Sequence, residues 1–322
     1  MAPLKEYSNF NEVIEKIQSD RFPLNINGLS QSGKSYILNG IFEEIDQSMV
    51  IIAHSEMEAK NIYEDLSLYT TEVYLFPAKE VVFYNVDAIS GDLRWARLKV
   101  IKEIIQNKNK KIIVASIDAL TTLYTTKESY EKYSMTIKSG SELNLKSLAK
   151  KLSECGYERV EVVEGKGEFS FRGGILDVFP PTAVYPYRIE LFGDEIESIR
   201  TFNVESQRSI EKVENFDIFA AKEVIVSEEV KNFASNKIRE EFKEQINKKN
   251  TNKESAEKLG KIVNRNLELL NETNTFETID SYLPFFYEEP ENFFDYLKGY
   301  LYVVDDVKRC QGKIESIYYE FN

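Results

Sequence analysis

Apolar residues in the first part of the chain gather in short runs separated by amphipathic stretches. The runs at 49–53, 73–76 and 111–115 predict buried strands, because each is a continuous apolar segment of strand length. Apolar positions recur every three or four residues at 59–66 and at 92–106, which predicts helices between the strands. Strands that alternate with helices favour βαβ units and a parallel sheet.

The pattern changes after a predicted helix at 143–155. Short apolar strands now follow one another with turns and without helices between them. The expected strands are 160–163, 168–172, 174–179, 187–192, 196–202 and 213–218. We therefore expect an inserted, mostly antiparallel α+β domain.

The last third of the chain is mainly helical at first. The charged stretch 227–270 predicts a solvated helical hairpin, and an aromatic cluster follows at 282–287. The apolar run 301–304 predicts a strand, and we expect it to return to the first sheet. Together with the phosphate-loop sequence G-x-x-x-x-G-K-S at residues 28–35, this order of elements indicates fold class α/β, a RecA-like P-loop domain with an insertion. Residues 1–130 and 219–322 form the RecA-like part, and 131–218 is inserted.

A phosphate-loop motif, G-x-x-x-x-G-K-S, occupies residues 28–35. Gly28 and Gly33 allow the backbone to curl so that amide groups face a phosphate. Lys34 suits the β- and γ-phosphates, and the Ser35 hydroxyl suits Mg²⁺. The alternative is a Gly/Ser turn before an ordinary helix.

The surroundings of the motif favour a nucleotide site. Residues 22–26 form an apolar run that predicts a strand before the loop, and a helix is expected to begin near Gly33. Ser32 belongs to the same candidate site. ATP with Mg²⁺ is the cofactor that this loop would hold.

Two acids follow the predicted strand 301–304, as in a Walker B motif. Asp305 would hold Mg²⁺ together with Ser35, and Asp306 would polarise water. Asp306 is one methylene shorter than the usual Glu and is poorly placed for that task. A surface turn after a strand is the alternative interpretation.

Composition narrows the function classes. The 322 residues carry 41 Lys and Arg against 54 Asp and Glu, a net charge of −13, which disfavours autonomous, nonspecific DNA binding. One histidine and two widely separated cysteines disfavour a metal site based on them and indicate free thiols in a reducing compartment. We expect no signal peptide, no membrane span and a cytoplasmic location.

The sequence also resembles a known family. The strings FRGGILDVFP at 171–180 and PYRIELFGDEIESIRTFNVESQR at 186–208 resemble domain 2 of the excision-repair protein UvrB. They resemble even more the UvrB-homology module at the N-terminus of transcription-repair coupling factors (Mfd). The resemblance extends to residues 75–101 and 112–124. The segment 77–89 lacks the Tyr-rich hairpin with which UvrB clamps DNA, so the coupling factors fit better.

The resemblance implies a function. A complete coupling factor is an ATP-driven translocase on double-stranded DNA that displaces RNA polymerase stalled at a lesion and recruits UvrA. Its N-terminal module is the part that binds UvrA. The family's contact residues match Arg172, Arg188 and Phe192 here.

The residues themselves fit such a contact. Arg188 and Phe192 alternate with apolar residues along one strand and so share a face. Arg and aromatic residues dominate interface hot spots. The alternatives are that Arg172 forms a salt bridge with Asp177 or Glu168, and that Phe192 lies in the core.

The sequence departs from many coupling factors because it keeps Lys34 and Ser35, as UvrB does. A UvrB-like, DNA-dependent ATPase with a working P-loop is therefore the rival function. Hydrolysis also needs an arginine finger from a second motor domain, and we expect none in these 322 residues. We expect nucleotide binding without turnover. Regulation of UvrA access by nucleotide is a third hypothesis.

Overall fold

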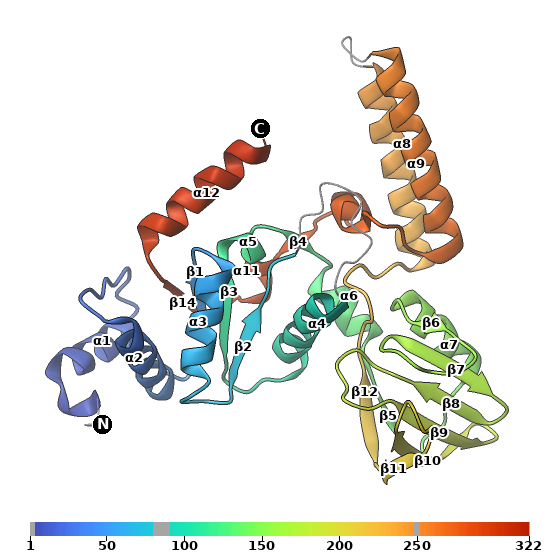
Figure 1. Cartoon of the computed structure of the whole chain (residues 1–322), viewed down its shortest axis with the longest axis horizontal. Coiled ribbons are helices and arrows are strands. Elements are labelled where there is room, and N and C mark those ends of the chain that lie inside the picture. Colours follow the sequence, from blue (N-terminus) through green and yellow to red (C-terminus); the bar gives the residue numbers. More distant parts are fainter. Residues whose placement is uncertain (1–3, 80–90, 248–251, 322) are drawn as a thin grey trace. The chain divides into compact units, whose positions relative to one another are not determined.

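The computed structural model describes residues 4–79, 91–247 and 252–321 (Figure 1). The chain divides into two compact units. Unit 1 contains residues 1–122 and 293–322, and unit 2 contains residues 123–292. The division expected from the sequence kept 219–292 with the RecA-like part, whereas the structure groups these residues with unit 2.

Unit 1 is built on a parallel sheet of four strands in the order β14-β1-β3-β2. The strands are β1 (Met49–Ala53), β2 (Val73–Phe76), β3 (Ile112–Ser116) and β14 (Leu301–Val304). The return of 301–304 to the first sheet is confirmed, since Met49 lies opposite Leu301 on β1 and β14. The helices of this unit are α1 (Ser8–Gln18), α2 (Gln31–Glu44), α3 (Glu56–Leu66), α4 (Gly91–Gln106), α5 (Ile117–Leu120), α11 (Phe293–Tyr296) and α12 (Val307–Phe321).

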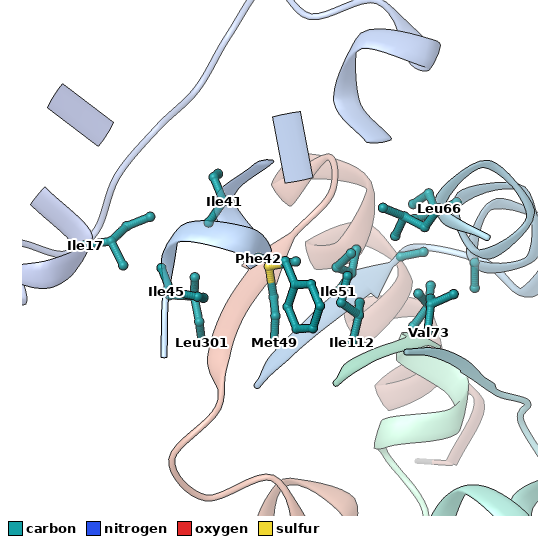
Figure 2. Packing of buried hydrophobic residues seen from close by; sticks show 14 of the residues in the cluster. Ile17, Ile41, Phe42, Ile45, Met49, Ile51, Leu66, Val73, Ile112 and Leu301 are labelled. Carbon is teal, nitrogen blue, oxygen red and sulfur yellow. The ribbon is translucent and has the colours of Figure 1, made fainter. Parts of the chain in front are cut away.

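The core of unit 1 lies between the sheet and the helices α1, α2 and α3 (Figure 2). Every residue of β1 and β3 is buried, which explains why both strands are continuous apolar runs. Met49 and Ile51 of β1 pack with Phe42 of α2 in this core.

The strand expected at 22–26 does not form. The segment has no strand assignment, and of its residues only Leu24 packs against the core. Phe22 and Ile26 are largely exposed. Pro23 has no amide proton to give to a ladder, which weakens the run as a strand.

Unit 2 contains a six-stranded sheet in the order β11-β10-β9-β8-β7-β6. All neighbouring pairs are antiparallel except β6 with β7, which is parallel. The predicted antiparallel insertion and the mixed α/β fold class are thus confirmed. The strands are β6 (Glu158–Arg159), β7 (Glu168–Arg172), β8 (Ile175–Val178), β9 (Tyr187–Phe192), β10 (Glu195–Phe202) and β11 (Ser209–Lys212).

Two details of this sheet differ from the expectation. The strand expected at 160–163 lies earlier, at 158–159, because the amides of Glu158 and Val160 bond to Gly167 and Phe169. Strand β12 (Asn215–Ile218) leaves the sheet and pairs with β5 (Met135–Lys138), a strand that the sequence pattern did not reveal. Helices α6 (Lys127–Tyr133) and α7 (Leu145–Glu154) complete this part.

The charged stretch after the sheet is a helical hairpin of α8 (Glu228–Asn247) and α9 (Lys253–Thr273). Its inner face is apolar and packs with the aromatic cluster that ends in α10 (Leu283–Phe286). Buried members include Ile238, Leu267 and Phe286. The hairpin buries side chains only in the half nearer α10, because none of the described residues between 239 and 262 is buried.

A short antiparallel pair joins the two ends of unit 2. Strand β4 (Leu123–Tyr124) lies beside β13 (Glu291–Asn292), and the amide of Lys127 donates to Glu291 at 2.7 Å. Among the helices of the described residues, none is both long and apolar enough to cross a membrane. Most of the segment 77–89 lies outside the described residues.

Candidate functional site

Lys34 and Asp305 meet at the carboxyl edge of the parallel sheet. The Lys34 Nζ atom lies 2.7 Å from Asp305 Oδ1, and both side chains are largely shielded from solvent. Asp305 directly follows β14, and its amide donates to Ile52 of β1 at 2.9 Å. Ligands of parallel α/β sheets bind at this edge. The structure therefore brings together the lysine and the first acid of the predicted nucleotide site.

The loop before Lys34 does not form a phosphate cradle in this conformation. Helix α2 begins at Gln31, two residues earlier than expected, so that Ser32 and Gly33 lie in its first turn. The Ser30 hydroxyl accepts the Gly33 amide at 3.3 Å, and the Ser30 carbonyl accepts the Lys34 amide at 2.9 Å. Only Gly28 adopts the left-handed backbone that the motif was expected to need, with φ 81°.

Ser35 is buried and turned toward α3. Its hydroxyl lies 3.5 Å from Asp65 Oδ2, a contact at the outer limit of a hydrogen bond. In the parts of the chain that the structure describes, no group of three or more His, Cys, Asp or Glu side chains is arranged to hold a metal.

Asp306 caps α12. Its backbone is left-handed, with φ 53°, and its Oδ1 atom accepts the Arg309 amide at 3.2 Å. Its Oδ2 atom lies 3.3 Å from Arg309 Nε. A side chain used as a helix cap is not aimed at a water molecule beside Asp305. The role of a second Walker B acid is therefore not supported by the geometry.

A second group of candidate residues lies on one face of the six-stranded sheet. Arg188 of β9 lies opposite Asp177 of β8 and grips it with two hydrogen bonds, 2.7 Å from Nε to Oδ1 and 2.8 Å from Nη2 to Oδ2. Asp177 is 1% exposed, so the pair is shielded from water. The hydrogen bonds to Asp177 are the main reason why the pKa of Arg188 lies above its ordinary value.

The rest of the Arg188 guanidinium is also held. Nη1 donates to the Gln207 carbonyl and Nη2 to Gln207 Oε1, both at 3.2 Å. The guanidinium carbon lies 4.5 Å from the centre of the Phe202 ring. Gln207 adopts a left-handed backbone, with φ 56°, and was not singled out in the sequence. The only signal for it was its place in the string that ends at Arg208.

Arg172 and Phe192 are far more accessible than Arg188. The Arg172 side chain is 53% exposed and makes a long ion pair, 3.5 Å, with Asp177. Phe192, at the end of β9, is 81% exposed and so is not a core residue. We call the face formed by Arg172, Arg188 and Phe192 the arginine–phenylalanine surface. It combines one anchored arginine with one freer arginine and an uncovered aromatic ring.

Comparisons with known proteins agree with this picture. Residues 135–224 match the family described as the UvrB interaction domain, a range that contains the arginine–phenylalanine surface. The chain is 33% identical over 317 residues to a transcription-repair-coupling factor of Bacillus subtilis. This match covers 98% of this chain and 27% of the relative. It is 30% identical over 303 residues to the transcription-repair-coupling factors of Staphylococcus aureus strains bovine RF122 and MRSA252, covering 91% of this chain and 25% of each relative.

The chain spans about a quarter of the length of the curated relatives that it matches. The resemblance drawn from the sequence strings is confirmed by both kinds of match. Residues 135–224 match the UvrB interaction domain family, and the chain as a whole is similar to about a quarter of a transcription-repair-coupling factor.

Proposed function

We propose that the chain is a recruiting module that binds UvrA through the arginine–phenylalanine surface. The observation that carries the proposal is the exposure of Phe192 on the face that also holds Arg172 and Arg188. An uncovered aromatic ring beside guanidinium groups is the composition of an interface hot spot. The family match at 135–224 supports the same partner.

The three residues would contribute unequally to UvrA binding. Arg188 already makes four hydrogen bonds, to Asp177 and Gln207, so it would act mainly by fixing the surface. Arg172 keeps donors for a partner carboxylate, and Phe192 would fill a partner pocket.

The role of the full-length protein is proposed from the resemblance to coupling factors. We propose that the full-length protein is an ATP-dependent translocase on double-stranded DNA. It would act in the cytoplasm, displace RNA polymerase stalled at lesions and hand the site to UvrA. RNA polymerase and DNA would bind through parts of the protein outside these residues.

The phosphate loop would serve a minor role in this module. The side chains of Lys34, Ser35 and Asp305 fit ATP with Mg²⁺, but Ser30 occupies the amides of Gly33 and Lys34. Binding would require the first turn of α2 to open and Lys34 to exchange Asp305 for a phosphate. When bound, Mg²⁺ would neutralise phosphate charge, and the helix cap at Asp306 leaves no second acid to orient water.

The rival function, a UvrB-like ATPase, keeps one observation in its favour. Lys34 and Asp305 lie together at the carboxyl edge of the sheet, where a nucleotide site belongs. Calorimetric titration with ATP–Mg²⁺ and a steady-state hydrolysis assay separate the two functions. We expect no turnover by this chain, and measurable turnover that Lys34→Ala abolishes would establish the rival.

Titration of the chain with purified UvrA tests the main proposal. We expect a saturable complex that is lost or strongly weakened in the Phe192→Ala variant. A folded chain that fails to bind UvrA, or an affinity unchanged by Phe192→Ala, would overturn the assignment.

A further inference from the structure

A cleft of about 450 Å³ lies at the edge of the six-stranded sheet, next to strand β6. It is open to solvent and combines charged with apolar side chains. It is lined by Arg159, Val160, Glu161, Val162, Phe171 and Arg172. Arg172 lines the cleft and also belongs to the arginine–phenylalanine surface, so the two regions meet at the end of β7.

Arg159 presents an unengaged guanidinium to this cleft. The residue is exposed, and its guanidinium carbon lies 5.9 Å from the centre of the Phe171 ring. Across the described ranges, no carboxylate lies within ion-pairing distance of Arg159. Contact with an aromatic face restrains an arginine while leaving its N–H groups free to donate. Arg159 is therefore ready for an external anion.

Arg172 has donors to spare as well. Its ion pair with Asp177 is long, at 3.5 Å, and the same carboxylate already accepts two shorter bonds from Arg188. A guanidinium carries five N–H donors in a fixed fork, and this contact engages at most a part of them. The cleft is thus lined by two arginines whose binding capacity is unfilled.

We propose that the cleft receives an acidic side chain, Asp or Glu, from the UvrA segment that covers the arginine–phenylalanine surface. The carboxylate would be bound by Arg159, with Arg172 at the rim of the cleft, while the stem of the acidic residue would contact Val160, Val162 and Phe171. The inference rests on the proposed function and adds a specificity-determining residue, Arg159, to it.

Glu161 adds a negative charge to the cleft. It lines the cleft and would repel an incoming carboxylate, so it lowers the affinity that the two arginines provide. A nucleic-acid phosphate is the less favoured occupant, because the cleft also contains apolar side chains and the chain carries a net charge of −13.

Titration of the whole chain with UvrA tests the inference. We expect Arg159→Glu to weaken binding about tenfold or more, with Arg159→Ala in between, because a charge-assisted bond is lost. Glu161→Gln should tighten binding by about threefold, a gain that a merely structural role would not produce. The matched control is Arg239→Glu on the exposed side of α8, which should bind like the parent chain.

The outcomes separate the two levels of the proposal. If Phe192→Ala weakens the complex while Arg159→Glu and Glu161→Gln do not change it, the cleft inference fails and the UvrA assignment stands. If the unsubstituted chain does not bind UvrA, both the UvrA assignment and the cleft inference fail. If Arg159→Glu weakens binding to a DNA duplex and leaves UvrA binding unchanged, the cleft is a nucleic-acid site and the inference is overturned.

Discussion

Arg188 and Asp177 lie opposite each other on neighbouring strands and are joined by two short hydrogen bonds, 2.7 and 2.8 Å. Asp177 is almost completely buried, and the Arg188 side chain is only 18% exposed. The pair therefore belongs to the fold as much as to the arginine–phenylalanine surface. Any experiment on Arg188 has to separate these two contributions.

Replacing Arg188 should destabilise unit 2. In Arg188→Ala, Asp177 becomes a buried charge balanced only by its longer ion pair with Arg172, at 3.5 Å. The expected cost is about 3–5 kcal/mol in the free energy of unfolding. Urea denaturation of the parent chain and the variant measures this difference. The matched control is Arg172→Ala, whose exposed side chain should contribute less than about 1 kcal/mol. Equal stability of Arg188→Ala and the parent would contradict the structural role.

Replacing Phe192 should affect binding without affecting stability. The ring is 81% exposed, so Phe192→Ala removes almost no buried area from the folded chain. We expect the UvrA affinity to fall by roughly 2 kcal/mol, as for an interface anchor. Val184→Ala is a suitable control, because Val184 is 80% exposed in the same unit and outside the proposed surface. A similar loss in both variants would show a nonspecific effect.

Freeing Lys34 from Asp305 should favour anion binding. In Asp305→Asn the ammonium group loses its carboxylate partner, so pyrophosphate without Mg²⁺ should bind roughly tenfold more tightly than to the parent chain. Lys34→Ala should have the opposite effect. Asp306→Asn is the control, since Asp306 caps α12 and does not touch Lys34 in the contacts described above. Calorimetry that finds identical affinities for Asp305→Asn and the parent would rule out competition between anion and carboxylate.

Alkaline pH should destabilise the fold through Cys155. Burial raises the pKa of its thiol from 9.0 to about 12. The folded chain keeps this proton while the unfolded chain loses it, so the unfolded state binds fewer protons and stability falls as the pH rises from about 9 toward 12. The slope is about 1.4 kcal/mol per pH unit for one such group.

Denaturation at about pH 8 and at about pH 10 measures this slope. Tyr157, whose pKa is also raised by burial, contributes in the same direction. The Cys155→Ala variant should therefore keep a shallower dependence on pH rather than none. A slope that is unchanged in the variant would exclude the buried thiol as a contributor.

The sequence predicted the sheet of unit 1 well because its two central strands, β1 and β3, are buried on both faces. Continuous apolar runs such as Met49–Ala53 have few alternatives to a buried strand. The strand at 301–304 returns to this sheet as expected. The run at 22–26 fails as a strand, because a strand also needs a partner edge and Pro23 cannot donate to one. Partner edges are a tertiary property that local pattern does not contain.

The sequence predicted some features of the candidate sites and missed others. Lys34 and Asp305 are far apart in sequence, and the motif logic correctly placed them together. The early start of α2 was missed, because the motif assumes a ligand that holds the loop open. The motif also gave Asp306 a catalytic place, whereas the left-handed turn after β14 uses it as a cap. The hydrogen bonds from Arg188 to Gln207 depend on a loop conformation that the local sequence pattern does not predict.

The parallel pairing of β1 with β14 has a consequence for biosynthesis. Translation delivers β1 early and β14 only after all of unit 2 has left the ribosome. Until then β1 has an open edge, which is a template for association with other chains. The β4–β13 pair brings the two ends of unit 2 side by side. Folding of unit 2, by bringing its two ends together, thus shortens the time during which the edge of β1 is unprotected.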